Sequence, residues 1–126
     1  MAEPRPGRPS LASLAGLGAL VVAVSLASGW WSRNQADRLG GEVAALAGPG
    51  DIQLLASDTC APCVVARGWL QRNAVPFDEC SIERDAACGE RFRAAGAPGT
   101  PLLFVRGRLQ LGFSPERVLA GLQRGA

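Results

Sequence analysis

The chain is organised around ten residues, Asp58-Thr59-Cys60-Ala61-Pro62-Cys63-Val64-Val65-Ala66-Arg67. Two cysteines with two residues between them follow an apolar run over residues 52–56 and precede a helical pattern. A helix N-terminus carries positive potential and unpaired amide N–H groups, so it would stabilise a thiolate at Cys60. Pro62 suits a first helical turn, where its missing N–H costs nothing. The arrangement predicts that Cys60 attacks a disulfide and that Cys63 resolves the mixed disulfide.

Two alternatives to redox chemistry have to be weighed for this cysteine pair. A C-x-x-C pair is also half of a zinc site, and the chain contains two more cysteines, Cys80 and Cys88. Their spacing is not that of a zinc knuckle, and the chain has no histidine to complete a mixed site. The second alternative is an inert structural disulfide. We favour the redox interpretation and predict no metal site.

Composition narrows the remaining function classes. The 126 residues suffice for one domain and an appendage. The net charge of +2 is too small to indicate a nucleic-acid partner, and none is expected. Without histidine, a His-dependent catalytic triad and a His general base are both excluded.

The N-terminal part of the sequence predicts a membrane segment. A Pro-rich tail over residues 1–10 precedes an uncharged apolar run over residues 11–31, which is long enough to span a bilayer as a helix. Trp30 and Trp31 end the run, and indole rings favour the membrane–water interface. A cleaved signal peptide is the alternative, with Ser25-Leu26-Ala27 at its cleavage positions. We favour an uncleaved anchor, followed by a spacer over residues 32–50.

The orientation of this anchor is predicted from its place as the first span in the chain. Two arginines precede the run and two follow it, so charge balance alone does not orient it. The usual behaviour of a first N-terminal span places the N-terminus inside and the following domain outside. We therefore predict a single-pass protein of a bacterial inner membrane with a periplasmic domain.

Residues 51–126 alternate between strand and helix patterns. The expected order is β-α-β-α-β-β-α, which predicts an α/β domain with a four-stranded mixed sheet covered by helices on both faces. The predicted strands occupy residues 52–56, 75–82, 102–105 and 108–111, and the predicted helices occupy residues 62–73, 85–95 and 115–124.

Three features together resemble the glutaredoxin branch of the thioredoxin fold. They are the C-x-x-C at the first strand–helix junction, Thr100-Pro101 before the third strand, and Gly112-Phe113 before the last helix. The resemblance covers residues 51–124. It implies a thioredoxin fold and a thiol–disulfide oxidoreductase, with a cis proline at Pro101 beside the cysteines. It also implies that Thr100, Pro101, Gly112 and Phe113 bind the substrate.

The sequence also departs from the glutaredoxin pattern. Glutaredoxins typically have C-P-Y-C, whereas this chain has C-A-P-C, which is similar to thioredoxins and membrane-tethered relatives. The stretch from Leu111 to Glu116 keeps one glycine of the usual glutathione-carboxylate clamp and is closer to NrdH-type redoxins. Asp58 and Thr59 stand where a basic residue often precedes the first cysteine. We therefore expect no cofactor, with glutathione as the less favoured alternative.

The second cysteine pair has several interpretations. Cys80 is expected near the end of the second strand and Cys88 in the second helix of the domain. A loop of this length closes readily, so a structural or accessory disulfide is plausible. Buried free thiols and a second redox pair that relays electrons to Cys60 and Cys63 are the alternatives.

These features predict a membrane-anchored thiol–disulfide oxidoreductase in which Cys60 is the nucleophile and Cys63 the resolving thiol. Its expected partners are a protein disulfide or dithiol substrate, or an electron-donating redox protein. The alternative is a thioredoxin-fold module that binds a metal or docks an assembly partner at the membrane. A third possibility is a [2Fe–2S] cluster that two chains share through Cys60.

Overall fold

The computed structural model describes residues 7–125, so the predicted tail over residues 1–10 lies mostly outside the described residues. The chain divides into two compact units between Gln35 and Ala36. The elements that follow one another along the chain are α1 (Leu11–Leu46), β1 (Ile52–Ala56), α2 (Ala61–Arg72), β2 (Asp78–Ser81), α3 (Ala86–Ala95), β3 (Leu102–Val105), β4 (Arg108–Leu111) and α4 (Pro115–Arg124).

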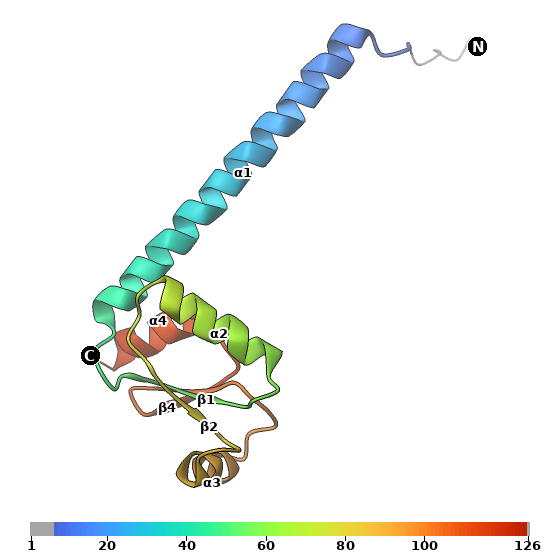
Figure 1. Ribbon diagram of the computed structural model, residues 1–126. Helices are drawn as coiled ribbons and strands as arrows, with labels where there is room; N and C mark the ends of the chain where they lie inside the picture. Colours follow the sequence, from blue (N-terminus) through green and yellow to red (C-terminus); the bar gives the residue numbers. More distant parts are fainter. Residues whose placement is uncertain (1–6, 126) are drawn as a thin grey trace, which may run out of the picture. The chain divides into compact units, whose positions relative to one another are not determined.

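The second unit is a four-stranded mixed sheet with the order β2-β1-β3-β4. Strand β1 pairs in parallel with β2 and antiparallel with β3, and β3 and β4 form an antiparallel hairpin. Helices α2 and α4 lie on one side of the sheet and helix α3 on the other (Figure 1). The predicted fold class, a thioredoxin-like α/β sandwich, is confirmed.

Side-chain alternation along the strands separates two cores. Ile52 and Leu54 of β1 point to the side of helices α2 and α4, where they join the larger core. Leu55 points to the opposite side and joins a smaller core against α3. The larger core contains ten buried residues and the smaller one three, so α3 is held by much less apolar contact. The buried residues of the smaller core are Leu55, Cys88 and Leu102.

Strand β2 is shorter than the sequence pattern indicates. The prediction was a strand over residues 75–82, but pairing begins at Asp78, which lies opposite Gln53. The N–H of Val75 instead donates to the carbonyl of Leu70 at the end of helix α2, with an N···O distance of 3.0 Å. Pro76 has no N–H to contribute to a ladder. Residues 75–77 therefore connect the helix to the strand.

The domain begins earlier than the sequence analysis placed it. Residues 32–50 were predicted to be a spacer and Asp51 the first domain residue. In the structure helix α1 continues to Leu46, and Val43 is completely buried in the larger core. At Gly40 an added Cβ would lie 1.9 Å from the Asn73 side chain, so only glycine permits this close approach. The last turns of α1 thus belong to the domain, because a short apolar face over Leu39 and Val43 meets the end of helix α2.

One arginine joins three segments at the edge of the domain. The Arg106 guanidinium donates to the Leu122 carbonyl of helix α4 at 2.6 Å and to the Leu46 carbonyl of helix α1 at 3.2 Å. It also pairs with the Asp51 carboxylate at 3.4 Å. Carbonyls at helix C-terminal ends lack intrahelical partners, so a cation there stabilises both helices.

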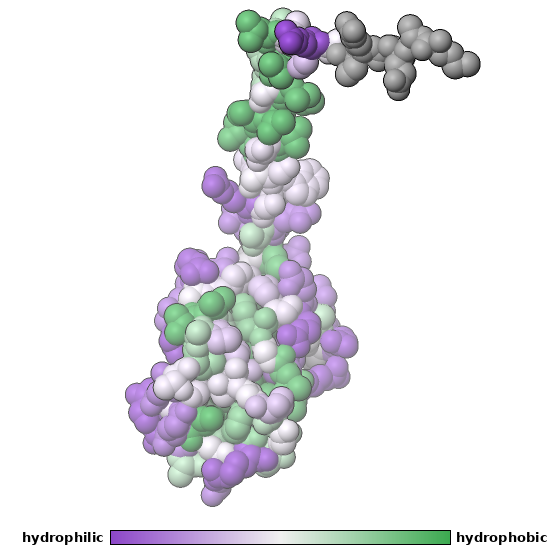
Figure 2. Space-filling model, turned by 90° about the vertical axis from the view of Figure 1, so that its right-hand side faces the viewer, coloured by the Kyte–Doolittle hydropathy of each residue, from purple (hydrophilic) through white to green (hydrophobic). Residues whose placement is uncertain are grey.

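The first part of helix α1 is apolar and exposed. The residues from Leu11 to Arg38 are all exposed. Figure 2 shows the large apolar side chains at the start of this helix on its surface, whereas the second unit displays many hydrophilic residues. By length and composition helix α1 can cross a membrane, although an N-terminal signal sequence meets the same criteria.

Candidate functional site

Cys60 is the N-cap residue of helix α2, at the C-terminal end of strand β1. Its Sγ accepts a hydrogen bond from the Cys63 N–H at 3.1 Å, and the two cysteines form a disulfide. Cys60 is half-buried, whereas Cys63 is completely buried in the first turn of the helix. An incoming thiol or disulfide can therefore reach Cys60 more easily than Cys63. The asymmetry matches the roles that exchange through a mixed disulfide requires.

A largely apolar groove lies on one side of the cysteine pair. It encloses about 560 Å³. The Thr100–Pro101 peptide bond is cis, and the Pro101 carbonyl accepts a hydrogen bond from the Gly112 N–H at 2.9 Å. That bond brings together two segments that the sequence analysis had singled out separately. The groove is lined by Ala61, Pro62, Val65, Thr100, Pro101, Gly112 and Phe113.

Phe113 also fixes this groove to helix α2. Its ring packs against Trp69 with 5.6 Å between centroids and an interplanar angle of 55°, an arrangement that aromatic pairs favour. Gly112, directly before it, has φ +71°, a conformation that a residue with a Cβ rarely adopts. The turn at Gly112 therefore directs the chain from β4 back toward the start of helix α4.

A polar cavity lies on the other side of Cys60. It encloses about 450 Å³, and Cys60 itself is among the residues that line it. Arg67 of helix α2 forms an ion pair with Glu79 of strand β2, with its Nε 2.8 and 2.9 Å from the two carboxylate oxygens. This pair raises the pKa of Arg67, chiefly because its guanidinium donates a hydrogen bond to the Glu79 carboxylate. The lining also includes Asp58, Ser81 and Arg84.

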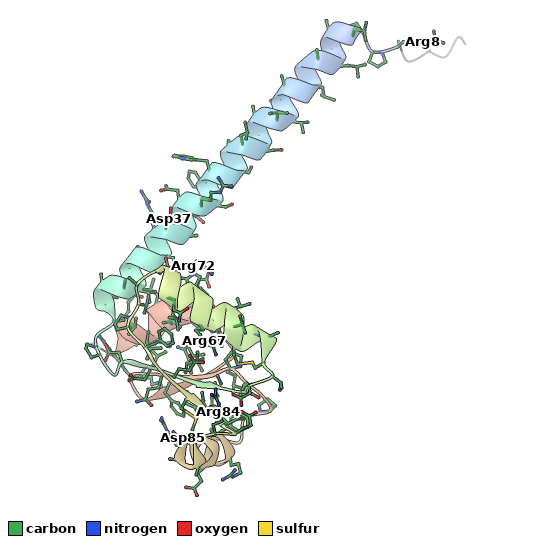
Figure 3. All side chains as sticks on the ribbon, in the orientation of Figure 1. Arg8, Asp37, Arg67, Arg72, Arg84 and Asp85 are labelled. Carbon is green, nitrogen blue, oxygen red and sulfur yellow. A yellow bond between two sulfur atoms is a disulfide. The ribbon has the colours of Figure 1, made fainter. Side chains whose placement is uncertain are left out.

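Five side chains, which we call the loop clamp, hold the loop before Cys60. The Asp58 carboxylate accepts from the Ser81 hydroxyl at 3.1 Å and from the Arg84 Nε at 3.0 Å. The Glu83 carboxylate accepts from the Ser57 hydroxyl and, at 3.2 Å, from the Asp58 backbone N–H. In Figure 3 the labelled Arg84 lies near the connection between the sheet and helix α3. The clamp therefore joins the residues that precede Cys60 to those that follow strand β2.

Hydrogen bonds in the loop clamp favour the ionised form of Glu83. The hydrogen bond from the Ser57 hydroxyl is the largest of the causes that hold the pKa of Glu83 below its ordinary value. The Asp58 N–H and the Ser81 hydroxyl lower this pKa further. Asp58 is neutralised by its ion pair with Arg84, with 2.9 Å between Nη2 and Oδ1. The two acids close to Cys60 are therefore both satisfied by donors.

The second cysteine pair forms a disulfide on the α3 side of the sheet. Cys80 of strand β2 is bonded to Cys88 in the first turn of helix α3, with 6.1 Å between their Cα atoms. Asp85 caps that helix, and its carboxylate accepts from the Ala87 and Cys88 N–H groups at 3.0 and 3.2 Å. The bond adds a covalent link where the smaller core provides little apolar contact.

Residues 7–125 contain no cluster of metal-binding side chains. In that part of the chain no three His, Cys, Asp or Glu side chains lie together as a metal site would need. All four cysteines are instead paired as two disulfides.

The site combines residues that sequence motifs located and residues that they missed. The structure gathers Cys60, Cys63 and the four predicted groove residues, Thr100, Pro101, Gly112 and Phe113, at one end of the sheet. Local motifs gave no signal for Arg67, Glu79 or the loop clamp. Their proximity to Cys60 depends on the parallel pairing of β1 with β2, in which Ala56 lies opposite Ser81.

Comparison with known proteins agrees with this geometry. Residues 52–110 match the glutaredoxin family model. A mutant of the thioredoxin-like protein BC3987 is 28% identical, with a TM-score of 0.53 over 59% of this chain and 96% of that one. The unmutated BC3987 is 27% identical, with a TM-score of 0.50 over 56% of this chain and 97% of that one. NrdH-redoxin from Escherichia coli is 19% identical, with a TM-score of 0.49 over 53% of this chain and 88% of that one. No curated protein matches the sequence.

Fold and site together define a thioredoxin-fold domain with a C-x-x-C disulfide at the start of its first domain helix. The match over residues 52–110 makes this domain glutaredoxin-like, and its cysteine pair supports a general role in thiol–disulfide redox chemistry.

The lowered pKa of Glu83 predicts a specific acid sensitivity. A carboxyl group whose folded pKa lies below its unfolded value stabilises the fold above the unfolded value and loses this effect as pH falls through the folded pKa. The melting temperature should therefore fall more steeply between about pH 5 and pH 3 for the native chain than for Glu83→Gln. Circular dichroism melts across this range measure the difference. Glu90→Gln, at an exposed acid of helix α3, is the control and should keep the native slope. Parallel slopes for the native chain and Glu83→Gln would contradict this role.

Proposed function

We propose that this protein exchanges thiols and disulfides through Cys60 and Cys63. The observation that carries the proposal is the position of Cys60, half-buried at the N-cap of helix α2, with the buried Cys63 one turn further on. In the reduced form the helix N-terminus and the Cys63 N–H stabilise a thiolate at Cys60. The family match and the thioredoxin fold support the same chemistry.

The exchange proceeds in two balanced steps. The Cys60 thiolate attacks one sulfur of a substrate disulfide, forms a mixed disulfide and releases the other substrate sulfur as a thiolate, which takes up a proton. Cys63 then loses its proton, attacks Cys60 Sγ and releases the second substrate thiolate. The substrate gains two electrons, and the Cys60–Cys63 disulfide is restored. Running the same steps backward oxidises a substrate dithiol.

The apolar groove favours a protein or peptide as the substrate. Its lining is mostly aliphatic and aromatic, and it continues from Ala61 and Pro62 to Thr100 and Phe113. A peptide that carries the disulfide can place apolar side chains there while its sulfur meets Cys60. No cofactor is needed for this exchange, and a redox protein or small thiol would return the cysteines to their starting state.

We further infer that helix α1 anchors the protein in a membrane. Its exposed, uncharged first part and the Trp30–Trp31 pair support this inference. A bacterial inner membrane with the domain in the periplasm is the location we propose, because disulfide exchange on secreted proteins takes place there.

Substitution of Cys60 and substitution of Cys63 should have different consequences. Cys60→Ser should abolish reduction of a protein disulfide such as that of insulin, because no thiolate remains to attack. Cys63→Ser should instead accumulate a mixed disulfide between Cys60 and the substrate, visible by non-reducing mass spectrometry. A Cys60→Ser variant with full turnover would refute the mechanism. If the native protein showed no turnover but carried stoichiometric metal or a visible chromophore, the metal-binding or cluster alternative would hold instead.

The apolar groove should determine preference for peptide substrates. Val65 is 65% exposed and lines the groove, so Val65→Ser should leave the fold intact. We expect kcat/KM for a peptide disulfide to fall about five- to tenfold, because a buried aliphatic contact is lost, with little change for hydroxyethyl disulfide. Val64→Ser is the matched control, since Val64 is 61% exposed but lines the polar cavity. Equal losses for both substrates, or for both variants, would argue against a peptide groove.

The membrane anchor is tested by extraction. The full chain expressed in a bacterium should stay in the membrane pellet after an alkaline carbonate wash, whereas a chain that starts at Ala36 should be released. Immunoblotting of both fractions measures this. If expression of the full chain gave a released product shortened by about 25 to 30 residues, the N-terminal segment would be a cleaved signal peptide.

A further inference from the structure

The Cys80–Cys88 disulfide closes a short loop that contains most of the loop clamp. Ser81, Glu83 and Arg84 all lie between the two cysteines, and each contacts the loop that precedes Cys60. Their partners, Ser57 and Asp58, come directly after strand β1. These three side chains therefore connect the loop closed by the second disulfide directly to the loop that precedes Cys60.

This disulfide is also accessible from solvent. Cys80 belongs to β2, an edge strand of the sheet, and is only half-buried. It lines the polar cavity next to Cys60 and also a second open cavity of about 250 Å³, whose lining includes Cys88, Gln53 and Arg91. Cys88 is 2% exposed, so an attacking thiol meets Cys80 first.

Besides the disulfide, helix α3 is held to the sheet by the smaller core, in which partly buried residues such as Ile82, Phe92 and Phe104 also pack. The smaller core has three buried residues, and one of them is Cys88 itself. The neighbouring Gln53 has a buried Oε1 without a hydrogen-bond partner in the described part of the chain. Arg91 stacks on Phe104, with 4.6 Å from its guanidinium carbon to the ring centroid, further along the helix. Opening the S–S bond therefore removes the covalent constraint on residues 81–87 and leaves the backbone hydrogen bond from Ile82 N–H to the Ala56 carbonyl and the Asp85 cap.

We propose that Cys80–Cys88 is a second thiol–disulfide exchange site, and that its reduction loosens the loop clamp and weakens the stabilisation of the Cys60 thiolate. The ligand class is a small dithiol or the dithiol of a redox protein. The regulatory half of this proposal rests on the proposed function of Cys60 and Cys63, whereas the exchange at Cys80 does not.

In the exchange at the second site, the dithiol supplies the two electrons that reduce the Cys80–Cys88 disulfide. One thiolate of the dithiol attacks Cys80 Sγ, and the bond to Cys88 breaks, so that Cys88 leaves as a thiolate and takes up a proton. The second thiol of the dithiol loses its proton and attacks the mixed disulfide, releasing the Cys80 thiolate, which is protonated in turn. The dithiol is oxidised to a disulfide, and two electrons reside on Cys80 and Cys88.

The direction of the coupling follows from charge. In the closed clamp Arg84 neutralises Asp58, two residues before Cys60. When the loop is released, the Asp58 carboxylate loses this cation and stands near the Cys60 thiolate uncompensated. The reduced form of the Cys60–Cys63 pair becomes less stable, so the pair should hold its electrons less well and become more reducing. Arg84 is largely exposed, which limits the size of the effect.

The first experiment isolates exchange at the second site. The full chain carrying Cys60→Ser and Cys63→Ser, kept in detergent, is equilibrated with dithiothreitol at graded ratios of reduced to oxidised form. Alkylation and peptide mass spectrometry then measure the reduced fraction of Cys80 and Cys88. We expect a reversible transition while far-UV circular dichroism keeps its native form. A bond that resists excess dithiothreitol until the protein is denatured would overturn the proposal. Because Cys60 is absent, failure of the proposed function does not affect this result.

The second experiment measures the coupling. In the full chain the equilibrium of Cys60–Cys63 with dithiothreitol is compared between the native protein and the double variant Cys80→Ala with Cys88→Ala. We expect the equilibrium to shift about two- to fivefold toward the Cys60–Cys63 disulfide, the range that one exposed ion pair allows. Arg84→Gln should shift it in the same direction while both disulfides remain. If the double variant does not fold, the Arg84→Gln variant alone still tests the coupling.

A matched control separates the loop clamp from general loss of charge. Arg93→Gln removes an equal charge from helix α3, at an exposed residue that does not line the cavity beside Cys60, and should leave the equilibrium unchanged. An equilibrium that is unchanged in Arg84→Gln would refute the coupling, and so would an equal shift in Arg93→Gln. If Cys60→Ser kept full turnover while Cys80–Cys88 still exchanged, the proposed function would fail and the second site would stand.

Discussion

Strand β1 is hydrogen-bonded along both edges, in parallel to β2 and antiparallel to β3, and the position of each site residue follows from this pairing. The parallel partner brings the end of β2 to the end of β1, so Ser81 lies beside the loop that leads to Cys60. The antiparallel partner brings the beginning of β3 to the same end, and with it Pro101. Helix α2 starts there too, which places its N-terminus over the cysteine pair.

The same pairing gives Cys60 two different surroundings. Toward β3 and β4 the site is apolar, because Pro101, Gly112 and Phe113 meet the start of helix α2. Toward β2 it is polar, with Arg67, Glu79 and the loop clamp. Under the proposed function, a disulfide substrate would bury apolar side chains on one side of Cys60 and meet hydrogen-bonding groups on the other.

The two faces of the sheet carry apolar cores of different size. Helices α2 and α4, with the last turns of α1, share a core of ten buried residues, while α3 packs on a smaller core of three buried and six partly buried residues. A covalent bond between Cys80 and Cys88 compensates for the thin side. Because this bond also closes the loop that holds Ser57 and Asp58, the face with the smaller core is the one connected to the loop before Cys60.

Local patterns in the sequence determined the element order and a helix start beside the cysteine pair, since caps, breakers and apolar periodicity act over a few residues. The groove segments were indicated instead by the resemblance to glutaredoxins. Three things were decided only by tertiary structure: the burial of Val43 in the domain core, the late start of β2 and the loop clamp around Asp58. Each depends on contacts between segments far apart in the chain. No local pattern records which exposed acid will meet which arginine, because surface charges are placed by the packing of the apolar faces beneath them.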